Sequence, residues 1–207
     1  MRKYIGEFIG TFGLSLVVLA VIASSNSALT PFFAALTLML FVYTVGHISG
    51  THINPAVTLG LLSWKKISQS QAISYIIAQF LGAMFARIVA ANLIPDLSKA
   101  LLPLGARLTN AGSVGIAEML GMMFFTFGIG TVVLGKISKG ATGLVVGGSL
   151  LIGLFIAGTG SNGILNPAVA LALGSFNLMY VLGPVIGAYL GFKLVNYLNP
   201  AEIKKKK

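Results

Sequence analysis

The chain has 207 residues, of which 56% are hydrophobic and only 9% carry a charge, and its mean hydropathy is +0.93. In soluble domains about a quarter of the residues are charged, so this composition excludes an ordinary water-soluble protein. The formal net charge of +10 comes from 14 basic and only 4 acidic residues. Because the bases lie at the ends of apolar segments, we interpret the excess as membrane topology and expect no nucleic-acid partner.

Six apolar segments follow one another along the chain, and each is a candidate membrane span. A hydrocarbon core of about 30 Å takes about 20 residues of helix. The segments are Tyr4–Ala23, Pro31–Val45, Gln71–Leu93, Val114–Leu134, Thr142–Ala157 and Leu178–Leu198. After the third comes a longer loop with Asp96, Lys99, Pro103 and Arg107. The sequence predicts one all-α membrane domain over residues 1–207, ending in a basic tail at 201–207.

Two of the connections are too apolar to be ordinary loops. The connection after the second span contains Ala56–Leu62, and the one after the fifth contains Ala168–Leu173. At a rise of 1.5 Å per residue, each run makes a helix of only about 10 Å. Such a helix enters a membrane partway and stops, so we expect two re-entrant half-helices.

The positive charges predict the orientation in the membrane. With a cytoplasmic amino terminus, six spans place 11 of the 14 bases on the cytoplasmic side: Arg2, Lys3, Lys65, Lys66, Lys136, Lys139, Lys193 and Lys204 to Lys207. Arg87, Lys99 and Arg107 then fall near or on the outer side. Because cytoplasmic loops carry the excess of Lys and Arg, we expect an integral protein of a cell's inner or plasma membrane with both termini in the cytoplasm.

The chain also repeats itself. The tripeptide Asn54-Pro55-Ala56 recurs as Asn166-Pro167-Ala168, and a glutamate precedes each copy at a similar distance, since 54 − 7 = 47 and 166 − 118 = 48. The two copies cover approximately residues 1–100 and 112–200. Each contains three spans, so the second must enter the membrane from the opposite side. Inverted repeats with discontinuous helices share a site near the midplane.

Each Asn-Pro pair is a helix start, because Asn caps the first turn and Pro at the first helical position leaves no N–H unpaired. Two opposed half-helices bring their positive dipole ends together at mid-membrane, with the amides of Asn54 and Asn166 as hydrogen-bond donors. That arrangement binds the oxygen of a water or hydroxyl group and repels a cation.

Glu7 and Glu118 are carboxylates within spans, and two roles are open to them. In the first, they carry protons in a coupled transporter. In the second, they accept hydrogen bonds from the backbone N–H groups of the non-helical segment before each half-helix, because such groups are costly to leave unpaired in hydrocarbon. Their matched spacing favours the second role. His47 and His52 flank the approach to the first motif; we favour packed, hydrogen-bonded histidines, and a role in the pore or its gating stays open.

Several kinds of chemistry are not expected. The sequence contains no cysteine, which excludes disulfides, thiolate metal sites and cysteine nucleophiles. The two histidines lack further ligands nearby, so we predict no metal site. Paired catalytic acids and nucleophile–base spacings are not visible either, and the chain is therefore not expected to be an enzyme.

The run from Gly46 to Thr58, Gly-His-Ile-Ser-Gly-Thr-His-Ile-Asn-Pro-Ala-Val-Thr, together with the second Asn-Pro-Ala and the paired glutamates, resembles the aquaporin (major intrinsic protein) family. The resemblance implies six tilted helices, two half-helices that meet at their Asn-Pro-Ala motifs, and a homotetramer with one pore per subunit in the lipid bilayer. It implies passive flow of water or small uncharged solutes without a cofactor. Asn54 and Asn166 would bind the permeant oxygen and interrupt a proton wire, while Glu7 and Glu118 would brace the loops.

The same resemblance places a selectivity filter at Ala34, Leu154, Gly163 and Val169. The family usually has Arg at the last position, and water-selective members commonly add an aromatic residue and a His; all three are missing here. We expect a wider and more apolar filter. Ala34 and Gly163 are similar to the residues of the glycerol- and metalloid-permeable branches, which mostly retain the Arg that is missing here. An apolar constriction can also dewet, and carbonyls near Gly160 and Gly163 are expected to keep it wet.

The sequence thus predicts a passive channel for small uncharged solutes, such as glycerol, urea, arsenous acid or boric acid, and for water. A plain water channel is the main alternative. A coupled transporter, which requires a carboxylate in the path, and a membrane scaffold without solute flux are further alternatives.

Overall fold

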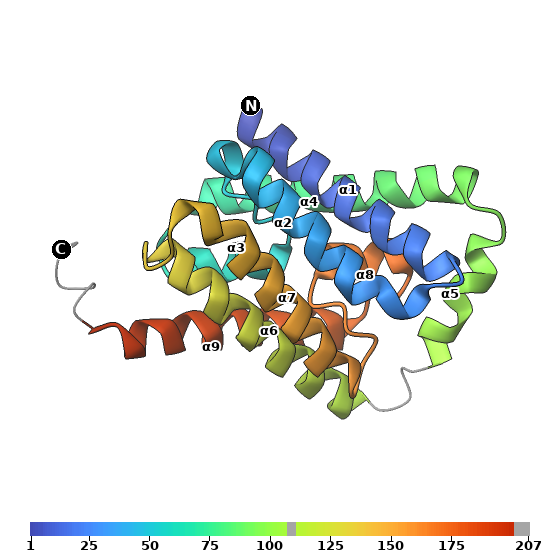
Figure 1. Cartoon of the computed structure of the whole chain (residues 1–207). Coiled ribbons are helices and arrows are strands. Elements are labelled where there is room, and N and C mark those ends of the chain that lie inside the picture. Colours follow the sequence, from blue (N-terminus) through green and yellow to red (C-terminus); the bar gives the residue numbers. More distant parts are fainter. Residues whose placement is uncertain (107–110, 201–207) are drawn as a thin grey trace.

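The computed structural model describes residues 1–106 and 111–200, and its regular elements are helices. Arg107 and the tail at 201–207 lie outside the described residues. Six long helices form the bundle in Figure 1: α1 (Arg2–Ala23), α2 (Thr30–Ser49), α4 (Gln69–Leu93), α6 (Ala111–Val133), α7 (Thr142–Gly158) and α9 (Leu178–Leu198). All six are long and apolar enough to cross a membrane, which confirms the predicted spans.

Two half-helices lie inside this bundle, as predicted. They are α3 (Pro55–Ser63) and α8 (Pro167–Leu173), and each begins at a proline whose preceding asparagine caps the first turn. Each half-helix packs on a long helix from the other half of the chain, α3 on α9 and α8 on α4. The chain is therefore one interlocked bundle rather than two separable ones.

Short turns complete the connections, with one correction to the prediction. The 3-10 helices η1 (Ser27–Leu29) and η3 (Lys139–Ala141) lead into α2 and α7. The connection around Asp96, predicted as a loop, instead contains the helix α5 (Leu97–Ala106). Leu97 and Leu101, four residues apart, are buried, and α5 packs against α1. Side chains four residues apart lie on one face of a helix, so these two leucines both face the bundle.

Glycines set how closely the long helices approach. A Cβ atom on Gly183 of α9 would lie 2.7 Å from the carbonyl oxygen of Gly115 on α6, and one on Gly187 would overlap the carbonyl oxygen of Met119. Gly82 of α4 lies in the same way against the backbone of Phe8 on α1. Small residues let helix backbones meet in a membrane, where the hydrophobic effect does not drive helix association.

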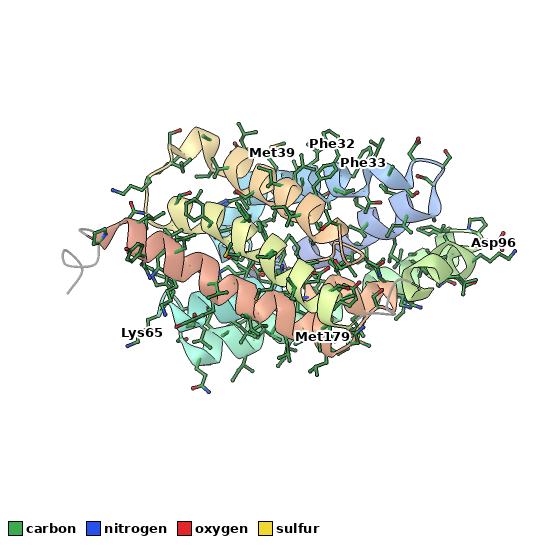
Figure 2. All side chains as sticks on the ribbon, turned by 90° about the horizontal axis from the view of Figure 1, so that it is seen from below. Phe32, Phe33, Met39, Lys65, Asp96 and Met179 are labelled. Atoms are coloured by element: carbon green, nitrogen blue, oxygen red, sulfur yellow. The ribbon has the colours of Figure 1, made fainter. Side chains whose placement is uncertain are left out.

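The outer surface and the two ends of the bundle fit a membrane setting. Large apolar side chains point outward from the long helices, and Phe32 on α2, which is 50% exposed, is an example visible in Figure 2. Lys65 and Asp96 lie toward opposite ends of the bundle in that view. The chain is thus an integral membrane protein, with α5 at the end that carries Asp96.

Candidate functional site

One cavity of about 750 Å³ runs into the bundle from the end where α5 lies. The helices α1, α2 and α7 supply mainly apolar side chains to its wall, and the segments that precede the two half-helices supply most of the polar groups. It is lined by both motif asparagines and by all four predicted filter positions: Asn54, Asn166, Ala34, Leu154, Gly163 and Val169. The structure therefore brings these six residues, distant in sequence, to one space.

The filter positions are small or apolar, and one of them requires glycine. Gly163 has a φ of +63°, which L side chains rarely adopt, and a Cβ atom there would lie 2.8 Å from the carbonyl oxygen of Leu154. Ala34 and Val169 add no polar side-chain atom. Among the described residues that line the cavity, none is Lys, Arg, Asp or Glu. Of the two regions whose carbonyls are expected to keep the filter wet, Gly163 lines the cavity itself, and Gly160 is outside the described lining while its neighbour Thr159 is part of it.

Each motif asparagine uses its side-chain oxygen to cap its own half-helix. The Oδ1 of Asn54 accepts a hydrogen bond of 2.9 Å from the backbone N–H of Ala56. The Oδ1 of Asn166 accepts one of 3.0 Å from Ala168 and a longer one of 3.4 Å from Val169. Because the caps occupy the oxygens, the asparagines offer donors rather than acceptors to the cavity.

The amide nitrogens of the two asparagines tie the half-helices together. The Nδ2 of Asn54 donates to the carbonyl oxygen of Leu165, and the Nδ2 of Asn166 donates to that of Ile53, both at 2.9 Å. Ile53 and Leu165 have φ values of +37° and +58°, a left-handed conformation that is strained for such side chains. Since an amide nitrogen carries two hydrogens and one is used here, each asparagine keeps one N–H for a ligand in the cavity.

Glu7 holds the chain that leads to the first half-helix. Its side chain is fully buried and accepts four hydrogen bonds. Oε1 accepts from Ser49 Oγ at 2.7 Å and from the backbone N–H of His52 at 3.0 Å; Oε2 accepts from the backbone N–H of Ile53 at 2.6 Å and from Gln79 Nε2 at 2.8 Å. Two backbone donors that precede a half-helix are thereby satisfied inside the bundle.

Glu118 makes the matching arrangement before the second half-helix. It too is fully buried and accepts from Ser161 Oγ at 2.6 Å and from the backbone N–H groups of Ile164 and Leu165 at 2.9 and 2.6 Å. Neither glutamate is among the described residues that line the cavity. The geometry favours bracing over proton transport for both.

The two histidines have different surroundings. His52 is buried and lines the cavity, and its Nδ1 lies 3.1 Å from Thr58 Oγ1. Because that hydroxyl donates its hydrogen to the carbonyl oxygen of Asn54 and accepts from Gln79 Nε2, the network assigns the imidazole hydrogen to Nδ1, so that Nε2 of the neutral ring is an acceptor. His47 is exposed in the last turn of α2 and is not among the described lining residues.

Sequence reasoning missed several supporting residues. Ser49 and Ser161 each precede their motif asparagine by five residues and each donates to the glutamate of its own half. Comparing the two copies position by position would have found this pair. Gln79 and Thr58 have no such signal, because only the fold shows that they meet Glu7 and His52.

Comparisons with known proteins agree with this geometry. A family model described as "Major intrinsic protein" matches residues 1–195. The chain is 32% identical to aquaporin NIP1-1 of Zea mays, with 96% of this chain and 76% of that protein covered. It is 30% identical to aquaporin AqpM of Methanothermobacter thermautotrophicus (96% and 97% covered) and 31% identical to the glycerol uptake facilitator protein-like 6 of Lactiplantibacillus plantarum (92% and 94%).

A solved structure has the same fold over nearly the whole length. The aquaglyceroporin from Plasmodium falciparum superimposes with a TM-score of 0.80 at 22% sequence identity, and the match covers 98% of each chain. The arrangement of long helices and half-helices is thus the one that this solved structure has.

Proposed function

The chain belongs to the major intrinsic protein family of passive membrane channels, which are not enzymes, and we propose that its pore conducts uncharged solutes larger than water as well as water itself. Glycerol, urea, boric acid and arsenous acid are the solutes we propose. One observation carries the proposal: a single cavity joins both motif asparagines to four filter positions, none of which is charged, aromatic or bulky and polar.

The filter residues support the wider pore. An arginine at position 169 would bring five fixed N–H donors and a positive charge into the constriction, and Val169 brings neither. Ala34 and Gly163 have small side chains or none, so neither narrows the constriction. A solute with a carbon skeleton can then contact the apolar wall while its hydroxyl groups face the asparagine donors.

The asparagines also support exclusion of protons. Each offers one N–H to the cavity, and a permeant oxygen that accepts from them points its own hydrogens away from the middle of the pore. Water molecules on the two sides then cannot form one continuous donor–acceptor chain. The positive ends of α3 and α8, worth roughly half a charge each, oppose cations at the same place.

We extend the proposal to the assembly and its orientation. By resemblance to the family, the protein forms a homotetramer with one pore in each subunit and has both termini in the cytoplasm. Its halves, approximately residues 1–100 and 112–200, are inverted repeats within one domain. The paired contacts of Ser49 with Glu7 and of Ser161 with Glu118 support the repeat.

Substitution of the last filter position tests the proposed solute range. In proteoliposomes, Val169→Arg should lower the flux of the bulkiest permeant much more than the flux of water, because it narrows the filter and adds donors. Val169→Leu is the matched control for size, since it adds one methylene group without charge. Equal flux of every solute through the parent and Val169→Arg would show that this position does not form the filter.

A further inference from the structure

Arg87 is a charged side chain in an apolar part of the surface. It lies six residues before the end of α4, and its neighbours Met84, Phe85 and Ile88 are all about half exposed or more. Six residues of helix rise about 9 Å, so Arg87 lies within the span rather than beyond it. An ionisable residue at such a depth is costly in hydrocarbon unless it has a partner, and by default it marks a function.

The partner of Arg87 is the end of a half-helix. Its Nη1 donates a hydrogen bond of 2.5 Å to the carbonyl oxygen of Ala172, in the last turn of α8. Gly174, which ends α8, lies against the same group, since a Cβ atom there would be 3.4 Å from Nη1. Backbone N–H groups satisfy the preceding carbonyls of Ala170 and Leu171. The guanidinium therefore donates to a carbonyl oxygen at the negative end of the dipole of α8.

That half-helix end is also part of the pore wall. Val169 and Leu173, on either side of Ala172 in α8, both line the cavity, and so does Ala100 of α5. The positive charge of Arg87 thus lies at the carbonyl end of α8, beside Leu173 of the cavity wall but outside the described lining itself. We take its distance from the pathway as one helix diameter, roughly 10 Å. The described lining of that pathway contains no charged residue of its own.

We propose that Arg87 is a specificity-determining residue that excludes cations from the α5 end of the pore by acting across α8. Without it, the carbonyl end of α8 would leave a negative potential beside an uncharged filter and attract cations. With it, one full positive charge outweighs the roughly half negative charge of the helix end, so that end carries a net positive charge. The inference rests on the proposed function, because a cation can be excluded only from a pathway that conducts.

The test measures two fluxes from the same proteoliposomes: glycerol re-swelling and the leak of K⁺ down an imposed gradient. Arg87→Gln removes the charge and keeps N–H donors on a shorter side chain. The ratio of K⁺ leak to glycerol flux should rise roughly tenfold, the effect of a unit charge about 10 Å away at an effective dielectric constant of about 20. Arg87→Lys keeps the charge and should restore the low ratio.

The controls separate this inference from simpler explanations. Lys193→Gln removes a positive charge from α9, far from the α5 end, and should leave the ratio as in the parent. Where Arg87→Gln does not fold, Arg87→Met, which suits the apolar neighbours, gives the same readout. An unchanged ratio in the charge-free variant, or a Lys variant that leaks as much as the Gln variant, overturns the inference. If the parent itself passes no neutral solute, the proposed function fails instead, and the inference falls with it.

Discussion

If Glu7 braces the loop before α3, its removal should destabilise the protein, and the hydrogen bonds of Glu7 give the size of the effect. Glu7→Gln keeps the size of the side chain but replaces one accepting oxygen by an NH₂ group. If that group replaces Oε2, it faces two donors, Ile53 N–H and Gln79 Nε2; if it replaces Oε1, it still faces the N–H of His52. At least one buried backbone donor then loses its acceptor, at about 1–3 kcal/mol, and the remaining bonds lose their charge assistance. We expect a total loss of about 2–4 kcal/mol.

A single fluorophore reports the affected region. Trp64 is the one tryptophan of the chain, follows directly after α3 and stacks on Phe192 of α9 with ring centroids 5.1 Å apart. Thermal unfolding in detergent, followed by this fluorescence, should show a midpoint that is roughly 5–15 °C lower in Glu7→Gln than in the parent.

The matched control makes the same chemical change at the surface. Asp96→Asn removes a carboxylate whose ion pair with Lys99 is 69–76% exposed, and such a pair is worth about 0–1 kcal/mol. If Glu7→Gln and Asp96→Asn both had the melting midpoint of the parent, the reasoning that Glu7 holds the loop would be refuted. The same variant tests the transporter alternative, since uptake that depends on a proton gradient in the parent and loses that dependence in Glu7→Gln would make Glu7 a proton carrier.

Two further predictions concern the end of the cavity near α5 and the packing of α6 against α9. The chain has no cysteine, so Ala100→Cys, at a residue that lines the cavity, should react with a bulky, membrane-impermeant thiol reagent and lose more than about half of its solute flux. The control is Leu102→Cys, at a side chain that is 72% exposed and outside the described lining, and it should keep its flux after labelling. Equal inhibition of both would show that Ala100 does not face the path. Gly187→Ala would force α9 away from the Met119 carbonyl and lower the free energy of unfolding by about 1–3 kcal/mol, which corresponds to a melting midpoint roughly 2–12 °C below that of the parent. Gly148→Ala, whose Cβ meets nothing within 4 Å, should melt at or above the parent temperature. Equal midpoints for the two glycine variants would refute the close packing of α6 and α9.

The elements that carry a local signal could be predicted from the sequence. The long apolar runs predicted the spans, and the two Asn-Pro pairs predicted where α3 and α8 begin, because both signals depend on neighbouring residues alone. The helix α5 was missed because the segment carries Asp96, Lys99 and Pro103, which are typical of a loop, although Leu97, Ala100 and Leu101 have the spacing of one helix face. The packing of α5 against α1 is a contact between distant parts of the chain that no local pattern indicates.

Pairings across the chain could not be predicted in this way. Gln79 reaches Glu7 across 72 residues, and Arg87 reaches Ala172 across 85. The sequence showed Arg87 only as a base near the outer side, since nothing local indicates that the end of a distant half-helix lies beside it. The filter positions came from the resemblance to a family; the structure adds that they share a cavity with both asparagines.

The central claim is that this pore passes a neutral solute larger than water. Stopped-flow light scattering on proteoliposomes shocked with hyperosmotic glycerol tests it most directly, because shrinkage reports water and re-swelling reports glycerol in the same trace. The proposed solute range predicts that re-swelling is faster than in protein-free liposomes. Accelerated shrinkage with re-swelling at the protein-free rate would contradict it for glycerol and indicate a plain water channel.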